Sequence, residues 1–485
     1  MDRLHIGIIG GGPAGYVAAL YAAAHGAQVT LAEKSAMGGT CLQRGCIPTK
    51  RLVAATHLLD KMRNASSFGI ALEGQISPNW ASMCQSASKV VIGIETGLLK
   101  LLDNRKVTLV TDVAYPIAGA KPSIGLQNAD PIQVDRLLLC TGSLPHRPSN
   151  FEFDDKTVCT SDEIWQWHDL PKSLMIIGEG VIACEFAFIF QSLGVSVNML
   201  GMAERPLPML DHDISRTIAR EMKKRRIQFK SGKAVTQLKK DNQQWVAYHQ
   251  QEELVKAERV LVCTGRIPNS ANLKLDEAFV RYDERGEIQV DQFMRTTSAN
   301  IYAAGDVTGG LMLAHAASAQ AKIAISHMLG MTCKKYQPQY VPLAVFTQPE
   351  VATVGLTEQR AIGQGLDIAV GTFDMRALGK AHAMGEISGN IKLVVDRTSQ
   401  QLLGAHMVGA NVTEMIHEVA LIISQQGYVD EITSTIHAHP TLSEGLAEAA
   451  EDVFSQADHK PLKNQRDSLN GHAERSTLYP SSYLG

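Results

Sequence analysis

Cys41 and Cys46 are the residues of this chain whose type and spacing most clearly allow redox chemistry. They lie in the run GGTCLQRGCIPTK, residues 38–50, whereas the other cysteines are scattered singly. One close pair, unlike the dense cysteine framework of a small secreted domain, favours a single reactive dithiol in a reducing compartment. A metal site is disfavoured because no second Cys or His pair with ligand spacing accompanies the first. The isolated thiols are expected to be buried or inert: Cys84, Cys140, Cys159, Cys184, Cys263 and Cys333.

A glycine-rich unit lies just before the dithiol and occurs a second time near residue 174. Each copy reads as an apolar strand, a glycine turn, a small-residue helix and a second strand. Within the turn, the first glycine permits a tight bend, the second lets the backbone approach a pyrophosphate, and the helix N-terminus faces the negative charge. Two such units predict two bound dinucleotides. The copies align without a gap, so that Gly10, Gly12 and Gly15 fall on Gly178, Gly180 and Ala183.

The ends of the second strands differ between the two copies. Glu33 ends the strand of the first copy, where a carboxylate can hold the ribose hydroxyls of an adenosine. The matching position of the second copy is Gly201, so the second site is expected to lack this carboxylate. Arg205 follows closely and would suit a 2′-phosphate. These residues therefore predict weakened discrimination between NAD and NADP, with NADP a possible cofactor.

Further segments suggest how the domains are divided. Two strands run into Thr-Gly, at Thr141–Gly142 and at Thr264–Gly265, where dinucleotide-binding domains are expected to end. Asp306 ends another strand and either binds a ribityl hydroxyl or caps the turn. From about residue 340, strands (391–395 and 402–408) alternate with apolar helices (412–425 and 445–454), which indicates an α+β domain.

Composition narrows the class of protein and of partner. A chain of 485 residues is too long for one hydrophobic core, and 46 basic against 49 acidic residues do not suggest nucleic acid or an anionic membrane as partner. The longest apolar stretch, residues 174–200, contains Glu179 and Glu185 and is not expected to span a membrane. The N-terminus reads as a buried strand and not as a signal peptide, so cytoplasmic residence is expected.

The run at residues 38–50 resembles the active-site signature of the pyridine nucleotide-disulfide oxidoreductases, especially that of the dihydrolipoamide dehydrogenases, and the resemblance extends from Gly10 to about Phe454. It implies an α/β fold with two Rossmann-like dinucleotide-binding domains and a C-terminal α+β dimerisation domain. It also implies FAD and NAD as cofactors, a lipoyl-carrying protein as substrate, and a homodimer. The expected divisions are an FAD-binding part (1–148), an NAD-binding domain (149–268), a central FAD-binding part (269–338), the dimerisation domain (339–458) and a flexible tail (459–485).

The resemblance assigns roles near the dithiol. Cys41 would exchange with the substrate, Cys46 would lie against the flavin as the charge-transfer thiol, and Lys50 and Glu185 would form an ion pair near the reactive flavin nitrogen. The remaining expected cofactor contacts are Gly10, Gly12, Gly15, Glu33, Thr40, Thr141, Gly142, Asp306 and Ala314 for the flavin nucleotide, and Gly178, Gly180, Ala183, Gly201 and Gly265 for the nicotinamide nucleotide.

The segment IHAHPTLSE, residues 436–444, resembles the C-terminal catalytic motif of the family. His439 would take a proton from the substrate dithiol, and Glu444 would hydrogen-bond the other ring nitrogen. Thr441-x-x-Glu444 before an apolar run is also a capping box, and one carboxylate with two oxygens can serve both purposes. The family resemblance further implies that His439 reaches the flavin site of the partner subunit.

Two alternatives remain beside a dihydrolipoamide dehydrogenase. One is a glutathione-reductase-like disulfide reductase using NADH or NADPH, and the other is a catalytically silent flavoprotein that acts as scaffold or sensor. Mercuric and large thioredoxin reductases are excluded because they need C-terminal redox residues, whereas the last cysteine here is Cys333. Arg44, between the two sulfurs in sequence, departs from the lipoamide pattern; we hypothesise that it stabilises the thiolate.

Overall fold

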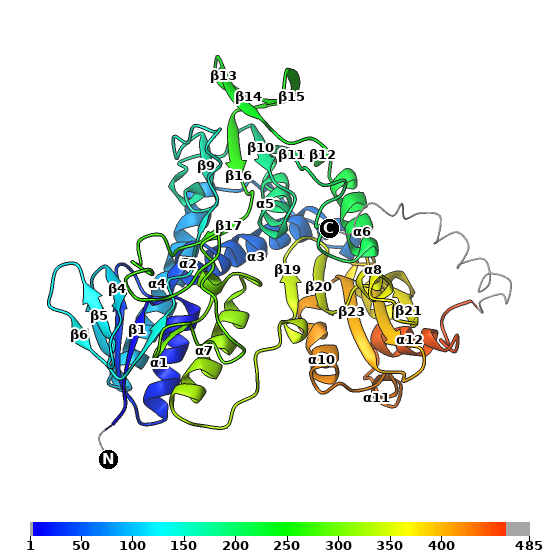
Figure 1. The fold of residues 1–485 in the computed structure, drawn as a ribbon. Coiled ribbons are helices and arrows are strands. Elements are labelled where there is room, and N and C mark those ends of the chain that lie inside the picture. The colour runs from blue at the N-terminus through cyan, green and yellow to red at the C-terminus, as the bar shows by residue number, and fades with distance from the viewer. Residues whose placement is uncertain (1–2, 462–485) are drawn as a thin grey trace. The chain divides into compact units, whose positions relative to one another are not determined.

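The computed structural model describes residues 3–461, which divide between two compact units (Figure 1). Within the described residues, the first unit comprises 3–209 and 218–341, and the second comprises 210–217 and 342–461. Each is described by itself. The finer domain boundaries expected from the sequence stay predictions.

The first unit contains a five-stranded parallel sheet with the strand order β18-β7-β1-β2-β3. Ile6 and Ile8 of its central strand are fully buried, as expected for a parallel sheet covered on both faces. Pro13 begins the helix after the glycine turn, at a position where the missing N–H costs no helical bond. The elements are β1 (His5–Ile9), α1 (Pro13–Ala24), β2 (Gln28–Glu33), α2 (Gly39–Gln43), α3 (Cys46–Arg63), α4 (Trp80–Asn104), β3 (Thr108–Thr111), β7 (Arg136–Leu139), β18 (Ile301–Ala303) and α7 (Ala314–Met328).

A second parallel sheet repeats this arrangement in the order β12-β11-β10-β16-β9. In this sheet β10, the glycine turn that follows it and α5 correspond in sequence to β1, the first glycine turn and α1. Its elements are β9 (Val158–Thr160), β10 (Ser173–Ile177), α5 (Val181–Ser192), β11 (Ser196–Leu200), β12 (Gln228–Lys230) and β16 (Arg259–Val262). The helix α6 (His212–Lys224) precedes β12, and its residues 212–217 belong to the second unit. Antiparallel strands complete the unit: β4 (Ala114–Ile117), β5 (Ser123–Leu126), β6 (Ile132–Gln133), β8 (Ser143–Pro145), β13 (Gln237–Asp241), β14 (Gln244–His249), β15 (Glu252–Ala257) and β17 (Arg266–Pro268).

The second unit is an antiparallel five-stranded sheet in the order β19-β20-β23-β22-β21, on which α10 and α12 pack. This α+β arrangement and its main elements confirm the sequence prediction. The elements are β19 (Leu343–Val345), β20 (Glu350–Gly355), α8 (Glu358–Gly363), β21 (Ile368–Asp374), α9 (Gly379–Met384), β22 (Asn390–Asp396), β23 (Leu402–Gly409), α10 (Val412–Ser424), α11 (Asp430–Thr433) and α12 (Glu444–Val453).

A buried ion cluster ties residues 210–217 to the sheet of the second unit. The Nζ of Lys392 on β22 lies 2.8 Å from Asp211 Oδ1 and 2.8 Å from Glu358 Oε2, and it also pairs with Asp213. The Lys392 side chain is 3% exposed and that of Asp211 is fully buried. These carboxylates raise the pKa of Lys392 against the opposing effect of burial, so the ammonium stays charged.

The start of the predicted flexible tail is held against the second unit. His459 Nδ1 lies 2.5 Å from Glu448 Oε1, and Lys460 Nζ lies 2.7 Å from Asp452 Oδ2. Both residues are thus paired with carboxylates of α12, and the flexibility expected of the tail stays a prediction. Residues 462–485 of the predicted tail lie outside the described residues. No helix of the described chain is long and apolar enough to cross a membrane.

Candidate active site

The two cysteines of the predicted redox pair lie at the junction of two helices of the first unit. Both are free thiols, with Cys41 in α2 and Cys46 as the first residue of α3. A hydrogen bond from the Cys41 thiol to the Cys46 sulfur lowers the pKa of Cys46 to about 7 and, with burial, raises the pKa of Cys41. The positive charge of Lys50 lowers the pKa of both thiols. The reduced pair therefore keeps its proton on Cys41 and its negative charge on Cys46.

The predicted ion pair between Lys50 and Glu185 is present. Lys50 Nζ lies 2.9 Å and 2.8 Å from the two carboxylate oxygens of Glu185. The Glu185 side chain is only 5% exposed and comes from α5, in the second sheet's helix layer. A cation beside a buried carboxylate offsets the cost of burying it, and the pair holds the Lys50 side chain one helical turn after Cys46. Its role near a flavin nitrogen remains a prediction.

Arg44 is directed to a carboxylate of the same unit. Its Nε lies 3.2 Å from Asp162 Oδ2, and its carbonyl oxygen accepts a hydrogen bond of 3.0 Å from Trp165 Nε1. The lowered pKa of Cys46 arises from Cys41 and Lys50. Because Asp162 offsets the guanidinium charge, the structure lends no support to the hypothesis that Arg44 stabilises the thiolate.

The first glycine turn has the shape that a dinucleotide needs. Gly10 has φ +103°, and a Cβ there would lie 2.3 Å from the carbonyl oxygen of Cys140, so only glycine fits. At Gly12 the nearest atom to an added Cβ is 3.8 Å away, which leaves this face of the turn open to a ligand. Glu33 Oε2 accepts a 2.7 Å hydrogen bond from the backbone N–H of Gly11. The carboxylate therefore lies against the turn, where it suits an adenosine ribose.

The second glycine turn repeats this geometry with one exchange of residues. Gly178 has φ +129°, and a Cβ there would meet the carbonyl oxygen of Cys263 at 2.3 Å; at Gly180 an added Cβ meets nothing within 4 Å. Gly201 itself offers no carboxylate. However, a Cβ at Gly201 would lie 3.0 Å from Oε2 of Glu179, so a carboxylate from the turn lies beside this position. Glu179 was read in the sequence only as an interruption of an apolar stretch.

The two Thr-Gly turns and Asp306 lie on connected segments of the first unit. Thr141 Oγ1 donates to the carbonyl of Asn269 at 2.8 Å, and β8 pairs with β17, which follows Gly265. Asp306 Oδ2 accepts a 2.6 Å hydrogen bond from Ser143 Oγ. One carboxylate oxygen of Asp306 thus holds the turn, and the expected binding of a ribityl hydroxyl stays a prediction. The same holds for the cofactor contacts expected of Thr40 in α2, Gly142, Ala183 and Ala314, the first residue of α7.

In the second unit, His439 is oriented by Glu444. His439 Nδ1 lies 2.7 Å from Glu444 Oε1, and the imidazole is largely exposed. The other oxygen of Glu444 accepts a 2.7 Å hydrogen bond from the backbone N–H of Thr441. One carboxylate therefore serves both the histidine and the helix start, although Thr441 Oγ1 donates to the Ala438 carbonyl and completes no capping box. By contrast, both ring nitrogens of the buried His437 are engaged, by Thr435 and Glu418.

The remaining thiols have the inert character expected of them where the structure tests it. Burial raises the pKa of Cys84 to about 11 and that of Cys263 to about 12. It also raises the pKa values of Cys140, Cys159 and Cys184. Within residues 3–461, no group of three or more His, Cys, Asp or Glu side chains is arranged to hold a metal ion.

Comparison with known proteins agrees with this geometry. Residues 4–321 match the model of the pyridine nucleotide-disulphide oxidoreductases, and residues 341–450 match the dimerisation domain of that family. The dihydrolipoyl dehydrogenase of Bacillus subtilis (strain 168) is 36% identical over 468 residues, covering 93% of this chain and 98% of that protein. The dihydrolipoyl dehydrogenase of Chlamydia muridarum is 38% identical over 454 residues, covering 91% and 95%.

Solved structures show the same fold over nearly the whole chain. LpdA from Mycobacterium tuberculosis superposes with a TM-score of 0.87 at 25% identity, covering 92% of this chain and 99% of that one. The HOCl-induced flavoprotein disulfide reductase RclA from Escherichia coli, in its Cu(II) complex, superposes with a TM-score of 0.83 at 28% identity, covering 93% and 99%. The resemblance found in the sequence is thus confirmed, and the chain belongs to the pyridine nucleotide-disulphide oxidoreductase family.

Proposed function

We propose that this chain is an FAD-dependent dihydrolipoyl dehydrogenase, which oxidises dihydrolipoyl groups carried by a protein and reduces NAD. The observation that carries the proposal is the unequal dithiol, in which Cys46 holds the negative charge beside Lys50. The names of the relatives that match over most of the chain support the substrate. One close dithiol among eight cysteines supports a reducing compartment such as the cytoplasm.

The difference in pKa between Cys41 and Cys46 determines which of the two sulfurs a substrate thiolate attacks. In the oxidised enzyme, a dihydrolipoyl thiolate attacks the Cys41 sulfur, the Cys41–Cys46 bond breaks, and Cys46 leaves as thiolate. The second dihydrolipoyl thiol, on losing its proton, attacks the mixed disulfide, closes the lipoyl ring and leaves the reduced pair. A thiol of low pKa leaves faster, so the lowered pKa of Cys46 makes Cys41 the better sulfur to attack.

Proton transfer is assigned to His439. Its Nδ1 is held by Glu444 at 2.7 Å, so the exposed Nε2 is the nitrogen left to take a proton from a substrate thiol. The match to a dimerisation domain supports a homodimer. Exposed apolar side chains on the second unit, Leu421 and Ile436 among them, are consistent with a surface that a second copy covers. In that dimer, His439 is proposed to serve the dithiol of the partner subunit.

The residues present fit the two dinucleotides that the family uses. The open face at Gly12, the helix N-terminus that follows and the Glu33 carboxylate would hold the adenosine diphosphate part of FAD. The corresponding turn at Gly180 would hold that of NAD. When bound, the flavin supplies the two-electron link between the reduced dithiol and the nicotinamide ring.

A steady-state assay of the purified holoenzyme tests the proposal. NAD reduction should depend on dihydrolipoamide, and NADPH or NADH should not support comparable reduction of oxidised glutathione. Rapid glutathione reduction would favour the glutathione-reductase-like alternative. Dithionite titration separates both enzymes from a silent flavoprotein, because a working dithiol and a flavin together take up four electrons and a flavin alone takes up two.

A further inference from the structure

The two dinucleotide-binding units carry the same residue types at exchanged positions. In the gapless alignment, Gly11 corresponds to Glu179, and Glu33 corresponds to Gly201. The first unit thus has glycine in its turn and glutamate at the end of its second strand. The second unit has glutamate in its turn and glycine at the end of its second strand.

The two carboxylates nevertheless occupy equivalent places. Glu33 Oε1 accepts a 2.9 Å hydrogen bond from the backbone N–H of Ser35. Glu179 Oε1 accepts a longer one, 3.4 Å, from the backbone N–H of Ala203, which is the residue that aligns with Ser35. The equivalent amide therefore marks the same location in both units, reached from the strand end in one and from the turn in the other.

The space at the exchanged positions agrees with this equivalence. A Cβ added to Gly201 would lie 3.0 Å from both Cβ and Oε2 of Glu179. A Cβ added to Gly11 would lie 3.1 Å from Cγ of Glu33. In each unit, the glutamate takes up part of the volume that a side chain at the other position would need, beside Met37 in the first unit and Phe229 in the second.

We propose that Glu179 is the residue that selects NAD over NADP. Its carboxylate lies where an acidic residue accepts a hydrogen bond from the ribose 2′-hydroxyl and repels a 2′-phosphate. The inference rests on the proposed function only in taking a nicotinamide dinucleotide as the ligand of the second unit. It holds whichever disulfide substrate the enzyme uses.

The Glu179 carboxylate has capacity for a ligand. Glu33 accepts hydrogen bonds from the N–H of Gly11, the N–H of Ser35 and the Ser35 hydroxyl. Among the described residues, the long bond from Ala203 is the one hydrogen bond that the Glu179 carboxylate receives. Because an ionised carboxylate has about four acceptor sites, most of them are left for a ligand.

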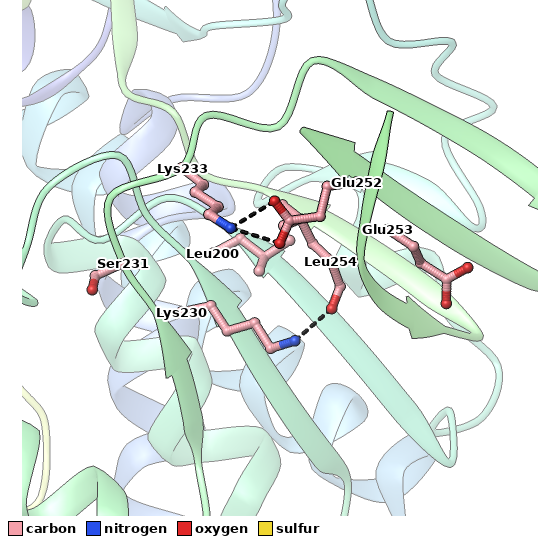
Figure 2. A pocket seen from close by; sticks show the side chains of 7 residues that line it. All are labelled: Leu200, Lys230, Ser231, Lys233, Glu252, Glu253 and Leu254. Carbon is pink, nitrogen blue, oxygen red and sulfur yellow. Dashed lines mark hydrogen bonds and ion pairs between the residues drawn. The ribbon is translucent and has the colours of Figure 1, made fainter. Parts of the chain in front are cut away.

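The basic side chains close to the end of β11 donate to acceptors of the protein. Arg205, which the sequence suggested as a 2′-phosphate ligand, donates from Nη2 to the carbonyl of Pro208 at 2.9 Å. Figure 2 shows the pocket beside Leu200, in which Lys230 bonds the Leu254 carbonyl and Lys233 pairs with both oxygens of Glu252 at 2.6 Å. Basic side chains thus lie close to the end of β11, but each is held by an acceptor of this unit, and the carboxylate of Glu179 governs the selection.

The position of the Glu179 carboxylate predicts how substitution of Gly201 affects nucleotide binding. Glu at position 201 would place a second carboxylate against that of Glu179, since its Cβ alone would lie 3.0 Å from Oε2. Two like charges on neighbouring side chains repel each other. Gly201→Glu alone should therefore weaken binding of both nucleotides and should not sharpen selectivity for NAD.

The test measures binding of NAD and NADP to the oxidised holoenzyme by calorimetric titration, which needs no disulfide substrate. Glu179→Gln keeps the size of the side chain and removes its charge, and it should lower the ratio of NAD to NADP affinity by roughly ten- to a hundredfold. The matched control is Glu204→Gln, which removes an exposed carboxylate from the loop just after Gly201. The control should change the ratio less than threefold. Equal changes in the two variants would overturn the proposal, because they would reflect general charge and not the position of Glu179.

A double variant tests the exchange itself. Glu179→Gly combined with Gly201→Glu reproduces the arrangement of the first unit and should restore the wild-type preference for NAD that Glu179→Gly alone loses. A double variant that binds FAD as well as wild type but prefers NAD no more than the single variant would overturn the inference. If instead dihydrolipoamide is not oxidised while the binding ratios behave as expected, the proposed function fails and the assignment of Glu179 stands.

Discussion

The hydrogen bond from Cys41 to Cys46 leads to a quantitative prediction for the reduced enzyme. With a pKa of about 7, half of the Cys46 side chains are thiolate at pH 7. An ordinary cysteine pKa of about 8.5 leaves only about 3% as thiolate, a difference of roughly fifteenfold. Cys41→Ala removes the donor, so the pKa of Cys46 should rise and its alkylation rate at pH 7 should fall by up to about fifteenfold. Cys41→Ser is the matched control, because its hydroxyl can still donate.

The assay is the rate of iodoacetamide labelling at Cys46 as a function of pH, followed by peptide mass spectrometry of the reduced protein. The sign follows from the chemistry: a thiol with a lowered pKa stays reactive as the pH falls, and loss of the donor moves the midpoint to higher pH. Burial keeps the pKa of Cys84, as one example, at about 11, so that thiol should contribute little labelling at pH 7. Equal midpoints in the alanine and serine variants would refute the reasoning and would leave the charge of Lys50 as the main cause.

Three further outcomes are expected. Cys41→Ser and Cys46→Ser should each abolish turnover with dihydrolipoamide while the flavin absorbance of the purified protein is unchanged; wild-type rates in either variant would contradict the exchange mechanism. His439→Gln should lower kcat by about 10²–10⁴-fold, and a loss below tenfold would remove His439 from proton transfer. Lys392→Met leaves buried carboxylates without their cation and should destabilise the second unit by about 3–5 kcal/mol in urea unfolding. Lys233→Met, which breaks an exposed pair, should lower the stability far less, and equal losses would show that the buried cluster contributes nothing special.

The fold was predictable from the sequence wherever one residue type repeats at a regular interval. The two glycine turns, each between an apolar strand and a small-residue helix, predict the two parallel sheets, and the structure has them. The strands at 391–395 and 402–408 appear as β22 and β23 with bounds extended by one residue at one or both ends. These patterns are local, and local hydrophobic periodicity is the feature of a sequence that reports most directly on secondary structure.

Side-chain direction was the feature that the sequence did not reveal. The alignment compared Glu33 with Gly201 and predicted a missing carboxylate, because a linear comparison cannot show that Glu179 reaches the same amide from the turn. Arg44 was placed beside the sulfurs by its position in the chain, whereas its guanidinium lies against Asp162. In both cases, the deciding contact joins residues that are separated in sequence.

The unequal roles of the two cysteines follow from where α3 begins. Cys46 is the first residue of an 18-residue helix, where the aligned backbone dipoles stabilise a negative charge. Lys50 follows four positions later, so both side chains project from the same face of the helix, and its ammonium is held in place by a nearly buried carboxylate. Cys41 has no such helix behind it, since α2 ends at Gln43. These effects add to the hydrogen bond from the Cys41 thiol, which lowers the pKa of Cys46 most, so the charge of the reduced pair settles on Cys46. Cys41 is then the sulfur that a substrate thiolate attacks. If α3 were displaced by one residue, so that Cys46 preceded the helix, the dipole and the lysine would no longer act together on one sulfur, and the dithiol would lose the direction that the proposed reaction needs.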